Sequence, residues 1–234
     1  FAAAAAIMFM IAPTLAQESQ LSADDARALE IFRAIISMRT AEGQGKVPAM
    51  AAYLAGEFKK AGFAKKDIEI RKSGETASLI ARYRGDGSSR RKPILFLAHM
   101  DVVDALPEDW ELDPFNLTEK DGFFFGRGVT DNKYGVANLT QTFIRLKKEG
   151  FVPDRDLIIV FTGDEESNMI TTRALAADPE LAGAEFALNT DAGGGSMGAD
   201  GKPVVYGVQA AEKTYADFEV TAVNQGGHSS RPRP

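Results

Sequence analysis

Acidic residues and a histidine gather at four places along the chain. AHMD, GDEE and NTD close apolar runs at 92–98, 157–162 and 186–190, and RGVTD leads into a helical pattern after residue 131. In an open parallel sheet, sites form beyond the C-terminal ends of the strands. Several ionised carboxylates at one edge would repel one another, and one or two divalent cations would compensate their charge. The first hypothesis is therefore a metal centre.

The residue types limit the chemistry of such a centre. The chain has no cysteine and only two histidines, so the ligands must be His, Asp or Glu. His99 and Asp101 are two residues apart, so in an extended segment they point to one face. Glu165 and Glu166 are adjacent, so one could bind metal while the other takes a proton from a metal-bound water. Two metals would share a carboxylate, for which Asp131 at a helix N-terminus is a candidate.

Each cluster also has a simpler interpretation when it is taken alone. HMD could be an ordinary strand end, DEE a solvated helix N-terminus that favours acids, and TDNK an Asp N-cap. Four such clusters in order, all expected at strand ends, favour the metal centre over four independent coincidences.

The composition is that of an ordinary soluble globular protein. Of 234 residues, 44% are hydrophobic and 26% charged, and the formal net charge is -6. The chain therefore has no basic footprint for nucleic acid or anionic lipid, and no nucleic-acid partner is expected. The length suits one large domain or one and a half ordinary ones.

Helical and strand patterns alternate along most of the chain. Helical periodicity is found in the segments 26–38, 48–62, 132–150 and 169–178. Strand patterns, several of them nearly continuous apolar runs, are found in 67–73, 77–85, 93–101, 156–166 and 185–195. This alternation predicts an α/β fold with a mainly parallel sheet and helices on both faces.

The pattern changes at about Gly207. Residues 215–227, YADFEVTAVNQGG, alternate like an antiparallel strand with one wet face. We therefore expect one domain over 17–206 and the start of a second domain, cut off at Pro234, over 207–234.

The first sixteen residues, FAAAAAIMFMIAPTLA, are apolar but too short to span a bilayer with normal flanks. Their small-residue end indicates a secretory signal peptide cut after Ala16, which predicts a periplasmic or secreted protein with no stable membrane span. A membrane anchor or a buried Ala-rich helix is the alternative. The missing basic n-region and the start at Phe1 suggest that the sequence is a fragment.

Taken together, the spaced motifs resemble one known family. The string HMDVVDA…DWELDPF…DGFFFGRGVTDNKYG…TGDEESN…NTDAGG…GGHSSRP is similar to the dizinc exopeptidases and amidohydrolases. That family includes bacterial glutamate carboxypeptidase, aminoacylase, succinyl-diaminopimelate desuccinylase, peptidase T and carnosinase. The match spans roughly residues 24 to 234. It implies a zinc-exopeptidase-like α/β catalytic domain over 17–206 that is incomplete at its C-terminal end, followed over 207–234 by the truncated start of an α+β lid or dimerisation domain.

The resemblance implies a metal-ligand set. His99 and Asp191 would bind one metal, Glu166 would bind the other, and Asp131 would bridge them. Two Zn²⁺ per subunit are expected, with Co²⁺ or Mn²⁺ as alternatives. The resemblance also implies a cis peptide bond between Asp131 and Asn132.

The same resemblance implies roles around the metals. Asp101 would orient His99, and Glu165 would be the general base and later the acid. His228 would lie on the lid and reach the substrate in the active site of a neighbouring subunit, so a homodimer through the lid domain is expected.

Two departures from the family pattern stand out. Asp104 occupies the place where the family usually has proline after DVV, which affects the shape of a loop. The family also needs one more ligand histidine near the end of the catalytic domain, and no histidine follows His228.

The sequence therefore predicts a metal-dependent hydrolase of peptide or N-acyl amide bonds in small peptides or N-acyl amino acids, of the exopeptidase, carboxypeptidase or dipeptidase type. An N-acyl-amino-acid deacylase is the alternative within enzymes. A non-catalytic binding protein on the same fold, or a structural module, are alternatives of another class. Glu165 argues against a pure binder, because a binder has no need of a base.

Overall fold

A computed structural model describes residues 21–211, 214, 216–221 and 223. It divides into two compact units, Phe1–Asp191 and Ala192–Pro234. The signal segment and His228 lie outside the described residues, and the domain limits expected from the sequence stay predictions. No helix of the described part is long and apolar enough to cross a bilayer.

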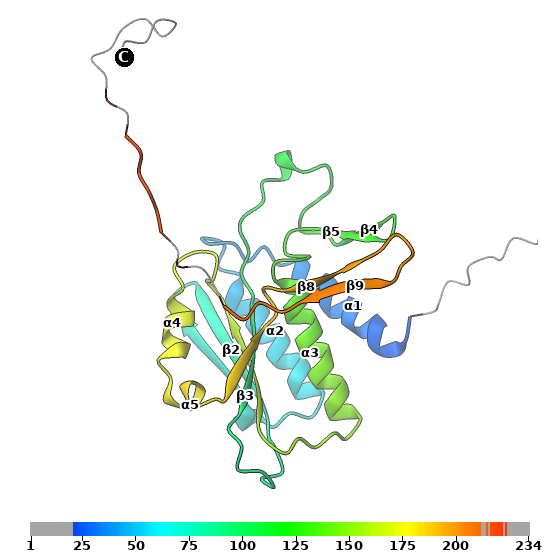
Figure 1. The fold of residues 1–234 in the computed structure, drawn as a ribbon, viewed down its shortest axis with the longest axis vertical. Coiled ribbons are helices and arrows are strands. Elements are labelled where there is room, and N and C mark those ends of the chain that lie inside the picture. Colours follow the sequence, from blue (N-terminus) through cyan, green and yellow to red (C-terminus); the bar gives the residue numbers. More distant parts are fainter. Residues whose placement is uncertain (1–20, 212–213, 215, 222, 224–234) are drawn as a thin grey trace, which may run out of the picture. The chain divides into compact units, whose positions relative to one another are not determined.

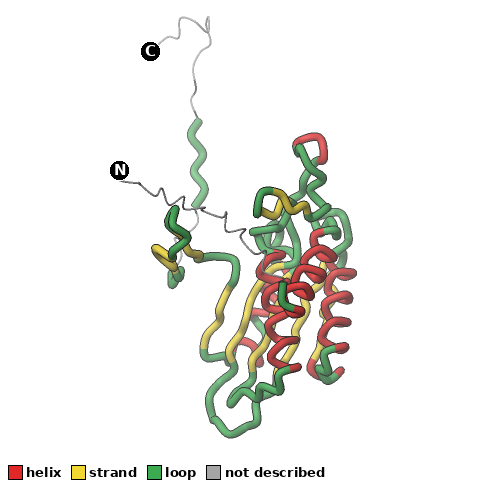
Figure 2. The backbone as a smooth tube through the Cα atoms, turned by 90° about the vertical axis from the view of Figure 1, so that its right-hand side faces the viewer, coloured by secondary structure: helices red, strands yellow, loops and turns green. Residues whose placement is uncertain are grey.

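The first unit is built on a five-stranded sheet with the order β1-β2-β6-β3-β7. The strands are β1 (Ile68–Ser73), β2 (Thr76–Tyr83), β6 (Leu157–Thr162), β3 (Ile94–His99) and β7 (Phe186–Asn189). β3 runs parallel to β6 and to β7, whereas β2 is antiparallel to β1 and β6. Figure 2 shows these strands side by side.

The parallel register fixes which residues leave the sheet together. His99 at the end of β3 is paired with Thr162 at the end of β6, and Leu97 is paired with Asn189 at the end of β7. Residues that follow these three strands therefore emerge at the same edge.

Helices cover both faces of this sheet (Figure 1), which confirms the predicted fold class. One face carries α1 (Ala23–Ile36), α2 (Val47–Lys60) and α3 (Lys133–Lys148), and the other carries α4 (Ile170–Ala176) and α5 (Pro179–Ala182).

Side-chain alternation in the strands explains why both faces can be covered. In β2, Leu79 packs into the core under α1–α3, whereas the next residue, Ile80, packs under α4 and α5. In β6, Ile159 and Ile158 divide in the same way. Successive side chains of a strand point to opposite faces, so nearly continuous apolar strands build two cores.

The helix ends follow the expected sequence signals. Ser22 caps α1 by accepting a hydrogen bond from the N–H of Asp25 at 3.1 Å. Gly62 and Gly150 follow α2 and α3 with φ of 89° and 74°, the left-handed conformation that ends a helix at low cost. Pro48 lies in the first turn of α2, where a missing N–H is tolerated.

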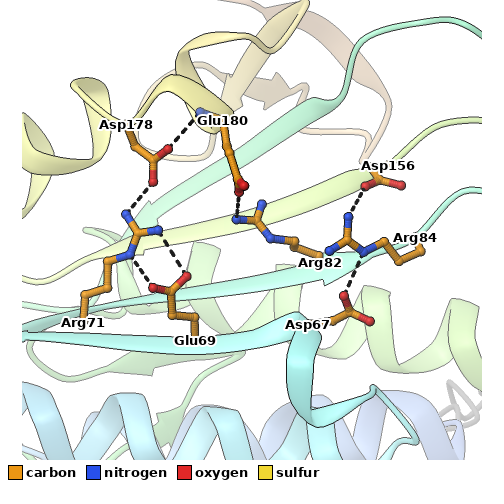
Figure 3. A network of polar contacts seen from close by, with 8 residues as sticks. All are labelled: Asp67, Glu69, Arg71, Arg82, Arg84, Asp156, Asp178 and Glu180. Atoms are coloured by element: carbon orange, nitrogen blue, oxygen red, sulfur yellow. Dashed lines mark hydrogen bonds and ion pairs between the residues drawn. The ribbon is translucent and has the colours of Figure 1, made fainter.

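Charged residues on the outer face tie α5 to the sheet (Figure 3). Arg71 in β1 donates to Asp178 at 2.6 Å, and Asp178 caps α5 through the N–H of Glu180 at 2.8 Å. Arg82 in β2 donates to Glu180 at 2.7 Å. Such partly exposed pairs contribute little each, and here they fix the position of a four-residue helix.

Three short pieces complete the first unit: the hairpin of β4 (Thr118–Lys120) and β5 (Phe123–Phe125), and the two 3₁₀ turns η1 (Lys65–Asp67) and η2 (Pro107–Asp109). The second unit contains an antiparallel hairpin of β8 (Gly194–Met197) and β9 (Pro203–Gly207).

The strand expected over 215–227 is not formed in its described part, 216–221 and 223. The side chains of Phe218, Val220 and Val223 are about nine-tenths exposed. A strand needs a neighbouring strand for its backbone hydrogen bonds, and an alternating pattern alone does not supply one.

Candidate metal centre

His99 is the centre of the acidic cluster. It is the last residue of β3 and only 2% exposed. Its Nε2 lies 2.7 Å from Oδ1 of Asp131 and 3.5 Å from Oδ1 of Asp191. One ligand atom from each of these three residues lies within 4.8 Å of the others. Three chain segments therefore deliver an imidazole and two carboxylates to one point.

Asp101 lies on the other side of the imidazole ring. Nδ1 of His99 is 3.1 Å from the backbone oxygen of Asp101 and 3.4 Å from its Oδ1. The second carboxylate oxygen of Asp101 accepts the N–H of Glu166 at 2.9 Å. Asp101 thus holds both the histidine and the turn after β6. The contact with His99 is the one expected of a carboxylate that orients a metal-binding histidine. The hydrogen bond from the N–H of Glu166 was not expected from the sequence.

Asp131 precedes α3 by two residues. The Asp131–Asn132 peptide bond is cis, as the family resemblance implies. The side chain of Asp131 is 61% exposed, in contrast to that of His99, which is buried. One face of the cluster is therefore open, which leaves room for further ligands.

Asp191 follows β7 and is the last residue of the first unit. Its hydrogen bond to His99 holds the pKa of the Asp191 carboxyl below its usual range, although burial opposes this effect. Asp191 is therefore ionised at neutral pH, as a metal ligand must be.

Glu165 and Glu166 lie in the turn that follows β6, half-buried. Burial raises the pKa of both carboxyls. Negative charge nearby adds to this: Asp191 acts most strongly on Glu165, and Asp131 on Glu166, while His99 opposes both shifts. Among the described residues, the carboxylate of Glu166 is not part of the convergent group of three. Three of the four predicted ligands are thus together, and Glu166 stands beside them.

The neighbouring Asp164 is hydrogen-bonded to the start of α4. Its carboxylate accepts the N–H of Ile170 at 2.6 Å, the N–H of Thr171 at 3.0 Å and the hydroxyl of Thr171. Asp164 is 5% exposed, so these donors satisfy its buried carboxyl oxygens at the start of α4.

Lys133 is a buried residue that sequence reasoning did not single out. Its Nζ donates to the backbone oxygens of Ile35 at 2.9 Å and Met38 at 2.6 Å, at the end of α1. Burial lowers the pKa of the Lys133 ammonium to about 7, and the charge of Asp101 opposes this shift. These bonds fasten the start of α3, and with it the segment that carries Asp131, to α1.

The electrostatics of the cluster favour a cation. Burial lowers the pKa of His99, but its hydrogen bonds to Asp101 and Asp191 raise it more, to about 11. In the metal-free chain the carboxylates therefore retain a proton on the imidazole. A divalent cation would replace that proton, and imidazole with carboxylate oxygens is a ligand set that suits zinc. The residues present thus fit the metal that the sequence predicts.

Comparisons with known proteins agree with this fold. The sequence model of the peptidase family M20/M25/M40 matches residues 95–229. The chain belongs to this family, which confirms the resemblance found in the motifs.

Individual relatives fall into the same group. A probable succinyl-diaminopimelate desuccinylase of Staphylococcus aureus is 36% identical over 174 residues, which are 73% of this chain and 40% of that protein. The N-fatty-acyl-amino acid synthase/hydrolase PM20D1 of Homo sapiens is 32% identical over 144 residues, 60% of this chain and 29% of that protein. The chain thus spans about two fifths or less of the length of these relatives.

Solved structures show the same fold. The di-peptidase Dug1p of Saccharomyces cerevisiae has a TM-score of 0.62 at 22% identity, covering 74% of this chain and 40% of that one. Human carnosine dipeptidase 1 has a TM-score of 0.60 at 20% identity, covering 74% of this chain and 42% of that one.

Proposed function

We propose that the protein expressed from the complete gene is a metal-dependent hydrolase of peptide or N-acyl amide bonds. The observation that carries the proposal is the convergence of His99, Asp131 and Asp191 beside the turn of Glu165. Zn²⁺ is the metal we propose, and Glu166 would hold a second ion, with Asp131 between the two. The open face at Asp131 supports access of a substrate.

The residues around the metal would each have a part in the reaction. A bound divalent metal would polarise the scissile carbonyl and acidify a water nearby. Glu165 would take a proton from the attacking water as the new C–O bond forms, and give a proton to the leaving nitrogen as the C–N bond breaks. A raised pKa suits this exchange, because a base works best when its pKa is near the working pH. Asp101 would keep His99 oriented.

Two groups of substrates remain in contention. The names of two relatives, a desuccinylase and an N-fatty-acyl-amino acid synthase/hydrolase, favour an N-acylated substrate from which an acyl group is removed. The structurally similar protein named a dipeptidase favours a small peptide as substrate. We propose the peptidase and keep the deacylase as the second candidate. A panel of dipeptides and N-acyl amino acids would separate them through the ratio of kcat/KM values.

Further parts of the proposal rest on sequence alone. His228 would donate a hydrogen bond to the substrate carbonyl of a neighbouring subunit in a homodimer. The apolar segment 1–16 would direct the protein to the periplasm or outside the cell.

Glu165→Gln tests the proposed chemistry. The variant should retain its metal, because no proposed ligand is changed, and should lose about 10²–10⁴-fold in kcat. Metal content by mass spectrometry and turnover are both measured. Glu149→Gln is the matched control, since Glu149 lies at the far end of α3, where it should leave both values unchanged.

The outcomes distinguish the rival functions. Near-normal turnover of Glu165→Gln with retained metal would remove Glu165 from the role of base. Absence of hydrolysis by the parent protein across the panel, with metal bound, would favour a binding protein. Absence of bound metal in the parent would contradict the proposal that the protein is a metal-dependent hydrolase.

A further inference from the structure

The hydroxyl of Thr190 lies where three segments of the candidate metal centre meet. Its Oγ1 is 3.1 Å from the backbone oxygen of Leu97 and 3.1 Å from Oδ1 of Asn132. Leu97 is two residues before His99, Asn132 directly follows Asp131, and Thr190 itself directly precedes Asp191. One side chain thus touches the segments of all three converging ligands.

Thr190 also ties the segment that follows β7 to the sheet through its backbone. β7 ends at Asn189, and the N–H of Thr190 donates to Leu97 O at 3.1 Å. The backbone bond fixes the end of β7 against β3 alone. The hydroxyl extends the connection to the segment of Asp131.

Proton counting limits how the hydroxyl can be used. A hydroxyl has one proton and two lone pairs, so Thr190 can donate to Leu97 O and still accept from a neighbour. The amino group of the fully buried Asn132 has no partner in the described part of the chain. Turning the Asn132 carboxamide by 180° would let this group donate to Thr190 Oγ1, so that both bonds form at once.

Gly135 in the first turn of α3 provides the space for this junction. A Cβ atom at Gly135 would lie 2.1 Å from Oγ1 of Thr190 and 2.2 Å from Oδ1 of Asn132. Gly135 has no positive φ, so its backbone conformation does not need glycine. Glycine inside a helix is unfavourable by roughly 0.5–1 kcal/mol relative to alanine, and here the close approach explains its presence.

We infer that Thr190 is a positioning residue of the metal centre, with Gly135 making room for it. Its hydroxyl fixes how far Asp191 lies from Asp131 and His99, and through that separation it tunes metal affinity. The inference rests on the proposed metal site.

The test compares Thr190→Val, which removes the hydroxyl but keeps the shape, with Thr190→Ser, which keeps the hydroxyl. In the complete protein, the Zn²⁺ dissociation constant is measured by competition with a chromophoric chelator. The visible absorption of the Co²⁺ form reports ligand geometry. Thr118→Val is the matched control, because its hydroxyl also donates to a backbone oxygen, that of Asn116 at 3.2 Å, but in the β4–β5 hairpin.

We expect Thr190→Val to weaken Zn²⁺ binding about tenfold and to change the Co²⁺ spectrum, as loss of an outer partner of a metal site commonly does. Thr190→Ser and Thr118→Val should match the parent. Gly135→Ala, which forces the junction apart, should weaken binding at least as much as Thr190→Val.

Failure of the proposed function and failure of the role inferred for Thr190 would give different results. A parent protein that binds no metal would overturn the proposed function itself. A parent that binds Zn²⁺, with Thr190→Val equal to it in affinity and Co²⁺ spectrum, would overturn the inference about Thr190 alone. If Thr190→Val does not fold, Gly135→Ala decides, and parental affinity in that variant would equally refute the junction.

Discussion

Replacing Asp164 by alanine should destabilise the protein while leaving the proposed metal ligands in place. The carboxylate is 5% exposed and accepts the N–H groups of Ile170 and Thr171 and the Thr171 hydroxyl. Asp164→Ala removes all three bonds and leaves the donors at the start of α4 without a partner. Asp164→Asn keeps one oxygen as an acceptor.

The size of the effect follows from these contacts. Loss of a helix cap costs about 0.5–2 kcal/mol, and each buried donor left without a partner costs about 1–3 kcal/mol. A cavity of about 170 Å³ borders Asp164, so water can reach some of the freed donors, which favours the lower end. We therefore expect about 2–4 kcal/mol for Asp164→Ala and about half of that for Asp164→Asn.

Thermal unfolding of the metal-free complete protein, followed by circular dichroism, measures this difference. The expected loss corresponds to a fall in Tm of about 5–15 °C for a domain of this size. Asp86→Ala is the matched control, because Asp86 also accepts a backbone N–H, from Ser88 at 2.8 Å, but on the exposed surface. An Asp164→Ala variant as stable as the control would refute the assignment of Asp164 as a buried cap.

Two further predictions concern the site. Zn²⁺ should bind more tightly as pH rises, by about tenfold per pH unit for one displaced proton, because the raised pKa of His99 keeps its imidazole protonated until metal displaces that proton. Calorimetry in buffers of different ionisation enthalpy should show the release of about one proton on binding. A Zn²⁺ affinity that does not change with pH would contradict this prediction. Mixing the inactive complete proteins His228→Ala and Glu165→Gln under conditions of subunit exchange should restore part of the activity, and exchange without recovery would exclude His228 from acting across a dimer.

Much of the fold could be predicted because the pattern of apolar residues is local. Isoleucine and valine runs such as Leu157–Thr162 mark buried strands, and Ser22 marks the start of α1. The parallel order of β6, β3 and β7 then places His99 and Asp191 at one edge without further information.

The remainder depends on contacts between segments distant in sequence. Lys133 is bonded to carbonyl groups almost a hundred residues earlier, at Ile35 and Met38, and no local pattern specifies this. Asp164 was grouped with the acids of the site because charge pattern alone does not distinguish a buried cap from a ligand. The role inferred for Thr190 depends on a gap that Gly135 leaves, which becomes visible only when α3 and β7 are placed together.

Diffraction from crystals of the complete protein soaked with Zn²⁺, measured on both sides of the zinc absorption edge, tests the central claim most directly. The account predicts an anomalous peak bonded to Nε2 of His99 and to carboxylate oxygens of Asp131 and Asp191, with typical zinc distances of about 2.0–2.2 Å. An anomalous map with no peak at these three residues, or with zinc bound only elsewhere, would contradict it.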